Sequence, residues 1–156
     1  MKKLLSIILL VFSITVLFSC DKMTDNGKLD GQWQLMSIKY KNLPTDSTYS
    51  RIIPKKEEGI YWRFQLDLLM IHTQYSNLNG YTHKTTARFN DNGKQLDITE
   101  TYINYFNKDS LLTDPNTRIL SPIGIDGNAE KFNIDKLDKK RMILSTPVKQ
   151  LVFRKF

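Results

Sequence analysis

Apolar and polar residues alternate along much of the chain after residue 30, and this alternation constrains the fold more than any other feature. The clearest run covers residues 59–70. Treated as one strand, it places six apolar residues on the same face: Ile60, Trp62, Phe64, Leu66, Leu68 and Met70. A period of two is typical of a strand with one buried face. Only two alanines occur in 156 residues, which argues against a helical bundle because alanine is the best helix former.

The same alternation predicts further strands on both sides of this run. They cover residues 31–41, 81–89 and 95–106, a weak strand near 117–121, and three short C-terminal strands around 132–134, 142–144 and 151–153. Asn79-Gly80 and Asn92-Gly93 are typical of tight hairpin turns, and residues 42–58 and 107–124 indicate long loops. Seven or eight antiparallel strands with little helix predict an all-β sandwich or barrel. An up-and-down barrel is favoured because closure removes the sheet edges.

The N-terminus carries a separate signal. Two lysines precede an apolar run from Leu4 to Phe18. At about 1.5 Å per residue this run reaches roughly 22 Å, which is too short for a hydrocarbon core of about 30 Å. A basic start followed by such a run is typical of a secretory signal peptide. The chain's one cysteine, Cys20, follows the run almost at once, so no internal disulfide is expected.

Leu17-Phe18-Ser19-Cys20 resembles the lipobox of bacterial lipoproteins. In that family the cysteine receives a diacylglycerol group on its sulfur and the leader is cut just before it. The resemblance implies that residues 1–19 are a signal peptide, that Cys20 is the lipid attachment site, and that residues 20–28 form a lipidated, flexible tether. We therefore expect an exported protein anchored in the cell envelope, in the outer membrane of a Gram-negative bacterium. A plain secretory peptide and an uncleaved anchor are the alternatives.

Gly31-Gln32-Trp33 resembles the Gly-x-Trp opening of lipocalins. The whole layout, from lipobox to a basic and aromatic C-terminus, is similar to that of the lipocalin-like lipoproteins common in Bacteroidetes. The resemblance implies an antiparallel eight-stranded up-and-down barrel over residues 29–156, with Gly31 and Trp33 at its floor. It also implies that a basic residue of the last strand stacks on Trp33. Arg154 is the first candidate, and Lys155 competes with it because alternation turns Arg154 away from the face of Phe153.

A barrel of this size leads to two expectations for function. In the first, the interior binds a small apolar ligand or lipid, with a cavity lined by apolar and aromatic side chains: Trp62, Phe64, Leu66, Leu68, Met70 and Tyr102. In the second, side chains fill the interior, and the outer face or the loops bind an envelope protein or a glycan.

Neither catalysis nor a cofactor is expected. The sequence lacks a nucleophile elbow, a His-Glu-x-x-His motif and a phosphate-binding loop. His72 and His83 flank the Asn79-Gly80 turn, but zinc needs three or four ligands and no further ligand is specially placed. The formal net charge of +7 is not taken as a sign of nucleic acid binding, because the chain carries an export signal and no nucleic-acid motif. Contact with anionic lipid or polysaccharide is left open.

Overall fold

The protein is described here from a computed structural model, which describes residues 26–41, 50–52, 59–73, 84–105 and 108–156. Cys20, His83 and the expected Asn79-Gly80 turn lie outside these residues. The described strands and one short 3₁₀ helix are β1 (Gly31–Tyr40), β2 (Ser50–Ile52), β3 (Ile60–Gln65), β4 (Leu68–Thr73), β5 (Lys84–Asp91), β6 (Gln95–Tyr105), β7 (Lys108–Leu111), η1 (Ser121–Ile123), β8 (Glu130–Leu137), β9 (Arg141–Ser145) and β10 (Lys149–Lys155).

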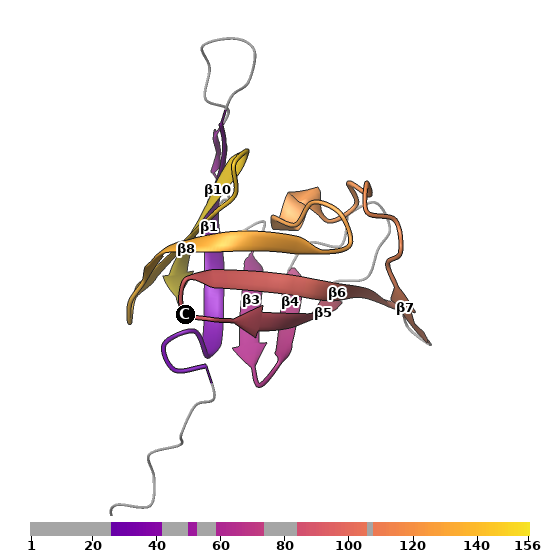
Figure 1. Ribbon diagram of the computed structural model, residues 1–156, viewed down its shortest axis with the longest axis horizontal. Coiled ribbons are helices and arrows are strands. Elements are labelled where there is room, and N and C mark those ends of the chain that lie inside the picture. The colour runs from indigo at the N-terminus through magenta and orange to yellow at the C-terminus, as the bar shows by residue number, and fades with distance from the viewer. Residues whose placement is uncertain (1–25, 42–49, 53–58, 74–83, 106–107) are drawn as a thin grey trace, which may run out of the picture.

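Eight of these strands form a closed antiparallel barrel. Their order is β1, β3, β4, β5, β6, β8, β9 and β10, and β10 pairs back with β1 to close the ring. The short strands β2 and β7 extend the sheet at its margins by pairing with β1 and β6. In Figure 1, β1, β3 and β4 run nearly at right angles to β5, β6 and β8. The expected fold class, an all-β eight-stranded barrel with little helix, is confirmed.

The barrel has two distinct ends. We name as the floor end the segment that enters β1 (26–30), the turns 66–67, 92–94 and 138–140, and the C-terminal residue Phe156. Hydrogen bonds tie these parts together, since the amide of Lys155 donates to Lys140 O at 2.9 Å and that of Phe156 to Gln32 O at 2.9 Å. In Figure 1 the segment 26–30, in indigo, lies at the lower end of β1. The opposite end, the mouth, carries the turn between β9 and β10.

The expectation of one strand over residues 59–70 is wrong. β3 ends at Gln65, Leu66 and Asp67 form a turn, and β4 returns from Leu68. Cross-strand partners share a face, so Leu69 opposite Phe64 points inward, while Leu68 and Met70 point outward. The sequence hides this turn because Leu66 continues the apolar alternation, and Asp67 is the only usual turn residue in it.

Large side chains fill the barrel interior along the described strands. Trp62 is fully buried near the centre, and its ring centroid lies 5.0 Å from that of Phe153 and 6.1 Å from that of Phe132. Further fully buried residues surround these rings: Leu35, Leu69, Leu96, Met142, Leu144 and Leu151. Close packing of this kind maximises dispersion contacts and leaves little room at these positions.

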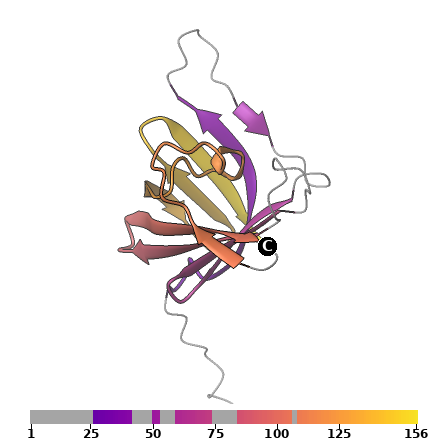
Figure 2. The ribbon, with the colours of Figure 1, turned by 90° about the vertical axis from the view of Figure 1, so that its right-hand side faces the viewer.

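Residues 112–129, which we name the mouth plug, cover the mouth (Figure 2). The expectation of a weak strand near 117–121 is wrong, because this segment is a loop that leads into η1. The indole N–H of Trp62 donates to Ile123 O at 3.1 Å. Ile123 and Ile125 are buried against the core. Gly124 has φ +100°, and a Cβ there would lie 3.1 Å from the side chain of Leu151, so glycine allows the plug to approach closely.

Candidate functional site

The barrel floor is held by Trp33 and Lys155. Trp33 is fully buried, and its indole N–H donates to Leu29 O at 2.7 Å. Lys155 lies opposite Trp33 in the register, with its Nζ 4.3 Å from the centroid of the Trp33 ring. The same ammonium donates to the carbonyl oxygens of Lys28, at 3.1 Å, and Asp30. Lys155 thus combines a cation–π contact with two carbonyl acceptors.

The expectation that Arg154 stacks on Trp33 is wrong. Arg154 points to the outer face and donates to Gln34 Oε1 at 2.8 Å, as strand alternation requires. Burial lowers the pKa of Lys155, against a smaller raising effect from the Asp30 charge. Gly31 has φ +101°, and a Cβ there would lie 3.3 Å from Lys155 Nζ. Glycine at this position therefore allows the positive φ angle and leaves room for the Lys155 side chain.

The six residues expected to line an interior cavity do not share one surface. Trp62 and Phe64 are buried in the core. Leu66 lies in the β3–β4 turn and is 58% exposed, and Leu68 and Met70 face outward. Tyr102 also faces outward, and its hydroxyl donates to Glu100 at 2.9 Å. The expected alternation from Leu96 to Tyr102 fails because a β-bulge at Thr99 shifts the parity of β6.

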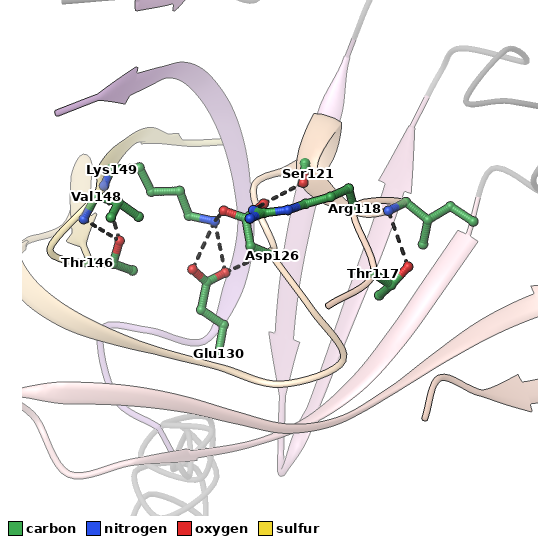
Figure 3. Close-up of polar contacts among 9 residues, drawn as sticks. Thr117, Arg118, Ser121, Asp126, Glu130, Thr146, Val148 and Lys149 are labelled. Carbon is green, nitrogen blue, oxygen red and sulfur yellow. Dashed lines mark hydrogen bonds and ion pairs between the residues drawn. The ribbon is translucent and has the colours of Figure 1, made fainter. Parts of the chain in front are cut away.

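A buried ion-pair cluster joins the mouth plug to the barrel wall (Figure 3). Lys149 is fully buried, and its Nζ lies 2.8 Å from Asp126 Oδ2 and 2.9 Å from Glu130 Oε1. Asp126 also accepts a hydrogen bond from the Ser121 hydroxyl and lies 3.3 Å from the Arg118 guanidinium. The amide of Asp126 donates to Glu130 Oε2 at 2.7 Å. Because each charge has partners, the cluster holds the plug in place.

Burial acts differently on the two carboxylates of this cluster. Burial raises the pKa of Glu130 above its usual range, against the charge of Lys149. Burial also acts to raise the pKa of Asp126, but hydrogen bonds from Lys149 and Ser121 and the charges of Lys149 and Arg118 lower it below the usual range. Sequence reasoning missed the cluster. The available signal was Lys149 at an inward position, in alternation with Leu151 and Phe153.

A groove of about 460 Å³ lies on the outside of the barrel. Outward side chains of β1, β3, β4, β5 and β6 line it, and we name it the outer-face groove: Gln32, Tyr61, Arg63, Met70, His72, Lys84, Thr86 and Asn104, with Ile71 and Thr85 beneath. The register places these side chains in two adjacent rows. Arg63, Met70 and Thr86 are successive cross-strand partners, and so are Tyr61, His72 and Lys84.

The groove presents cations and one unsatisfied acceptor. Its described lining contains no carboxylate, and among the described residues Arg63 and Lys84 make no ion pair. The amide nitrogen of Asn104 donates to Asp109 Oδ1 at 2.7 Å. The Oδ1 of Asn104 is buried and has no hydrogen-bond partner among the described residues, an arrangement that costs stability.

The aromatic wall of the groove is fixed by the C-terminus. The ring of Tyr61 meets that of Phe156 edge to face, with centroids 5.1 Å apart. A smaller hollow of about 240 Å³ adjoins the groove and shares Thr86 with it. Sequence reasoning expected Met70 to line the interior and considered His72 only as a possible zinc ligand. It missed the groove because strand pairing that is invisible in the sequence brings these residues together.

The described part of the chain holds no group of three or more His, Cys, Asp or Glu residues that is arranged for a metal ion. His72 lies in the outer-face groove. In the described ranges, no helix combines the length and the apolar character needed to cross a bilayer.

Comparison with known proteins agrees with this architecture. The model of a family described as a lipocalin-like domain matches residues 14–156. The chain belongs to this lipocalin-like family. A lipocalin-like protein from Bacteroides uniformis is similar in structure, with a TM-score of 0.57 and 18% identity, over 83% of this chain and 100% of that one. An uncharacterized protein from Bacteroides eggerthii gives a TM-score of 0.54 and 18% identity, over 82% and 99%. No curated protein matches the chain.

Proposed function

We propose that this lipocalin-like protein is a non-catalytic binding module, anchored to the cell envelope by a lipid on Cys20, and that its outer-face groove binds an acidic glycan. The observation that carries the proposal is the groove itself. Its described lining combines two cations, Arg63 and Lys84, that make no ion pair among the described residues, an aromatic ring, and no carboxylate.

The filled interior favours this binding mode over an interior apolar ligand. Trp62, Phe132 and Phe153 are each at most 1% exposed and pack against one another at the barrel centre. The mouth plug adds the buried Ile123 and Ile125 above them. An apolar ligand at this place would have to displace side chains that are already close-packed.

The chemistry of the groove matches a sugar that carries carboxylates. Arg63 and Lys84 form charge-assisted hydrogen bonds with carboxylate groups. The ring of Tyr61 and the side chain of Met70 give the apolar contact that a pyranose face requires.

The same lining argues for binding without hydrolysis. Most glycoside hydrolases place two carboxyl groups across the bond that they cleave. The described residues of the outer-face groove include no aspartate or glutamate. Arg63, His72 and Lys84 therefore hold and orient an anionic ligand in this proposal and transfer no proton.

Calorimetric titration tests the binding site. The purified protein should bind oligogalacturonate and not the neutral maltohexaose. Arg63→Gln and Lys84→Gln should each weaken the affinity about tenfold, the effect expected for one charge-assisted hydrogen bond. Lys39→Gln removes an exposed charge outside the groove and should leave the affinity unchanged. Equal weakening by all three variants, or equal binding of the neutral glycan, contradicts the proposed site. Binding of an acidic peptide in place of the glycan indicates a protein partner.

The anchor is tested separately by labelling cells with radioactive palmitate. The wild-type protein should incorporate label and fractionate with membranes, and Cys20→Ser should do neither. Label retained by Cys20→Ser overturns the proposed attachment site.

A further inference from the structure

We infer that the floor end of the barrel is a docking surface for the anionic headgroups of the bilayer to which the protein is tethered. This inference rests on the lipid anchor of the proposed function, and it adds an orientation. The floor faces the lipid, while the mouth plug faces away from it.

The tether leaves the barrel at the floor end. The side-chain amide of Asn26 donates to Leu66 O at 2.7 Å and to Asp30 Oδ1 at 2.7 Å, so the first described residues are fixed against the β3–β4 turn. Asn26 follows Cys20 by six residues. Six extended residues reach roughly 20 Å. A lipid on Cys20 therefore keeps the floor end within roughly 20 Å of the membrane surface.

The floor end carries an excess of unpaired positive charge. Five exposed cations at this end make no ion pair among the described residues: Lys28, Lys94, Lys139, Lys140 and Arg141. Four carboxylates lie at or beside this end. Asp30 accepts hydrogen bonds from Asn26, and Asp91 accepts one from the Gly93 amide. Asp67 pairs with Arg88, and Asp138 pairs with Lys136 and accepts two backbone N–H groups. The field at this end is therefore positive and attracts an anionic surface.

Two exposed apolar side chains stand among these cations. Leu66 is 58% exposed and Phe156 is 69% exposed. Leu66 also adopts φ +55°, a left-handed conformation that strains a leucine and suits glycine or asparagine. A solvent-exposed leucine kept in a strained turn points to a function at that position. Insertion between headgroups gives it one, since apolar and basic side chains together bind the interface.

A nitroxide depth measurement tests the orientation in the acylated protein. Acylation converts the sulfur of Cys20, the chain's one cysteine, into a thioether that does not react with the spin label. Leu66→Cys therefore introduces the one free thiol to which the spin label can attach. In vesicles containing phosphatidylglycerol, its label should be shielded from a water-soluble nickel relaxant and accessible to oxygen. Val148→Cys is the matched control, because Val148 is 54% exposed at the mouth and its label should stay in water. If both labels are equally accessible to nickel, the inference is wrong.

A second measurement separates this inference from the anchor. The mature Cys20→Ser variant carries no lipid, and it should still co-sediment weakly with phosphatidylglycerol vesicles and not with phosphatidylcholine vesicles. Adding Lys139→Gln and Lys140→Gln should reduce that binding about thirtyfold, whereas Lys39→Gln should leave it unchanged. If the protein binds equally to both kinds of vesicle, and the double variant binds as well as its parent, the docking surface is refuted, whether or not Cys20 is acylated.

Discussion

At the scale of single residues, the sequence offers two neighbouring cations, Arg154 and Lys155, as candidates to stack on Trp33. The structure places Lys155 on the ring. Lys155→Met should lower the free energy of unfolding by about 1–2 kcal/mol, because it removes a cation–π contact and hydrogen bonds to two carbonyl groups. Arg154→Met removes an exposed charge and one side-chain contact, and should cost about 0.5 kcal/mol or less. Urea denaturation measures both. Equal losses would contradict the assignment of the floor to Lys155.

Trp33 itself is expected to contribute far more. Trp33→Ala should cost about 3–5 kcal/mol, because it empties a fully buried site at the floor. Denaturation in urea measures this loss, and a cost below about 1 kcal/mol would show Trp33 to be peripheral.

Residue identity predicted the floor only in part. Gly31 and Trp33 could be placed there from a resemblance, and the choice of Lys155 follows from strand alternation once the last strand is known to continue to residue 155. Lys149 shows the limit of such reasoning. Its position in the alternation points inward, but its partners Asp126 and Glu130 come from other elements. Sequence spacing carries no information on such a contact.

At the scale of elements, the β3–β4 turn stores strain at Leu66. Leu66→Gly should raise the free energy of unfolding by about 0.5–1 kcal/mol, because glycine adopts φ +55° without a steric cost. Thermal or urea denaturation measures the change. A clear loss of stability would mean that Leu66 makes packing contacts that outweigh the strain.

The mouth plug should respond to acid through Asp126. Its pKa is lowered in the folded state, so this carboxylate stabilises the fold above its ordinary pKa, near pH 4, and the contribution is lost as the pH falls through the lower folded value. Asp126→Asn should therefore reduce stability at pH 7 and flatten the decrease in stability below roughly pH 4. Asp114→Asn removes an exposed charge from the same segment as a control. If the free energy of unfolding of Asp126→Asn falls below roughly pH 4 as steeply as that of the wild type, Asp126 is not the group that makes the fold sensitive to acid.

The strands could be predicted far better than their connections. The alternation places β1, β5, β6 and the last three strands within a few residues of their observed bounds. It fails at the Leu66-Asp67 turn, where Leu66 continues the apolar alternation, and at Thr99, where a bulge changes parity. The short strands β2 and β7 pair only at the margins of the sheet, so no long periodic pattern marks them.

At the scale of the whole molecule, the barrel separates three tasks. The interior and the mouth plug are packed and buried, the outer-face groove is the proposed binding site, and the floor end is the proposed membrane-facing surface. The all-β class could be predicted from the alternating strands and the lack of helix, and the resemblance to lipocalins supplied the eight-stranded barrel. The expected strand count was close because the 59–70 run is two strands and the segment 117–121 is none. The groove could not be predicted, because its lining comes from five strands that the register alone brings together.

Nuclear magnetic resonance mapping distinguishes a filled barrel that binds its ligand on the outside from a barrel that binds a ligand in its interior. Amide and methyl signals of the labelled protein are recorded during titration with oligogalacturonate and, separately, with a fatty acid. If the ligand binds on the outside, oligogalacturonate should shift the signals of Arg63, Lys84 and Asn104. Neither ligand should shift the interior methyl signals of Leu69, Leu144 and Leu151. Fatty-acid shifts centred on those interior methyls, with the groove unchanged, would contradict binding on the outside.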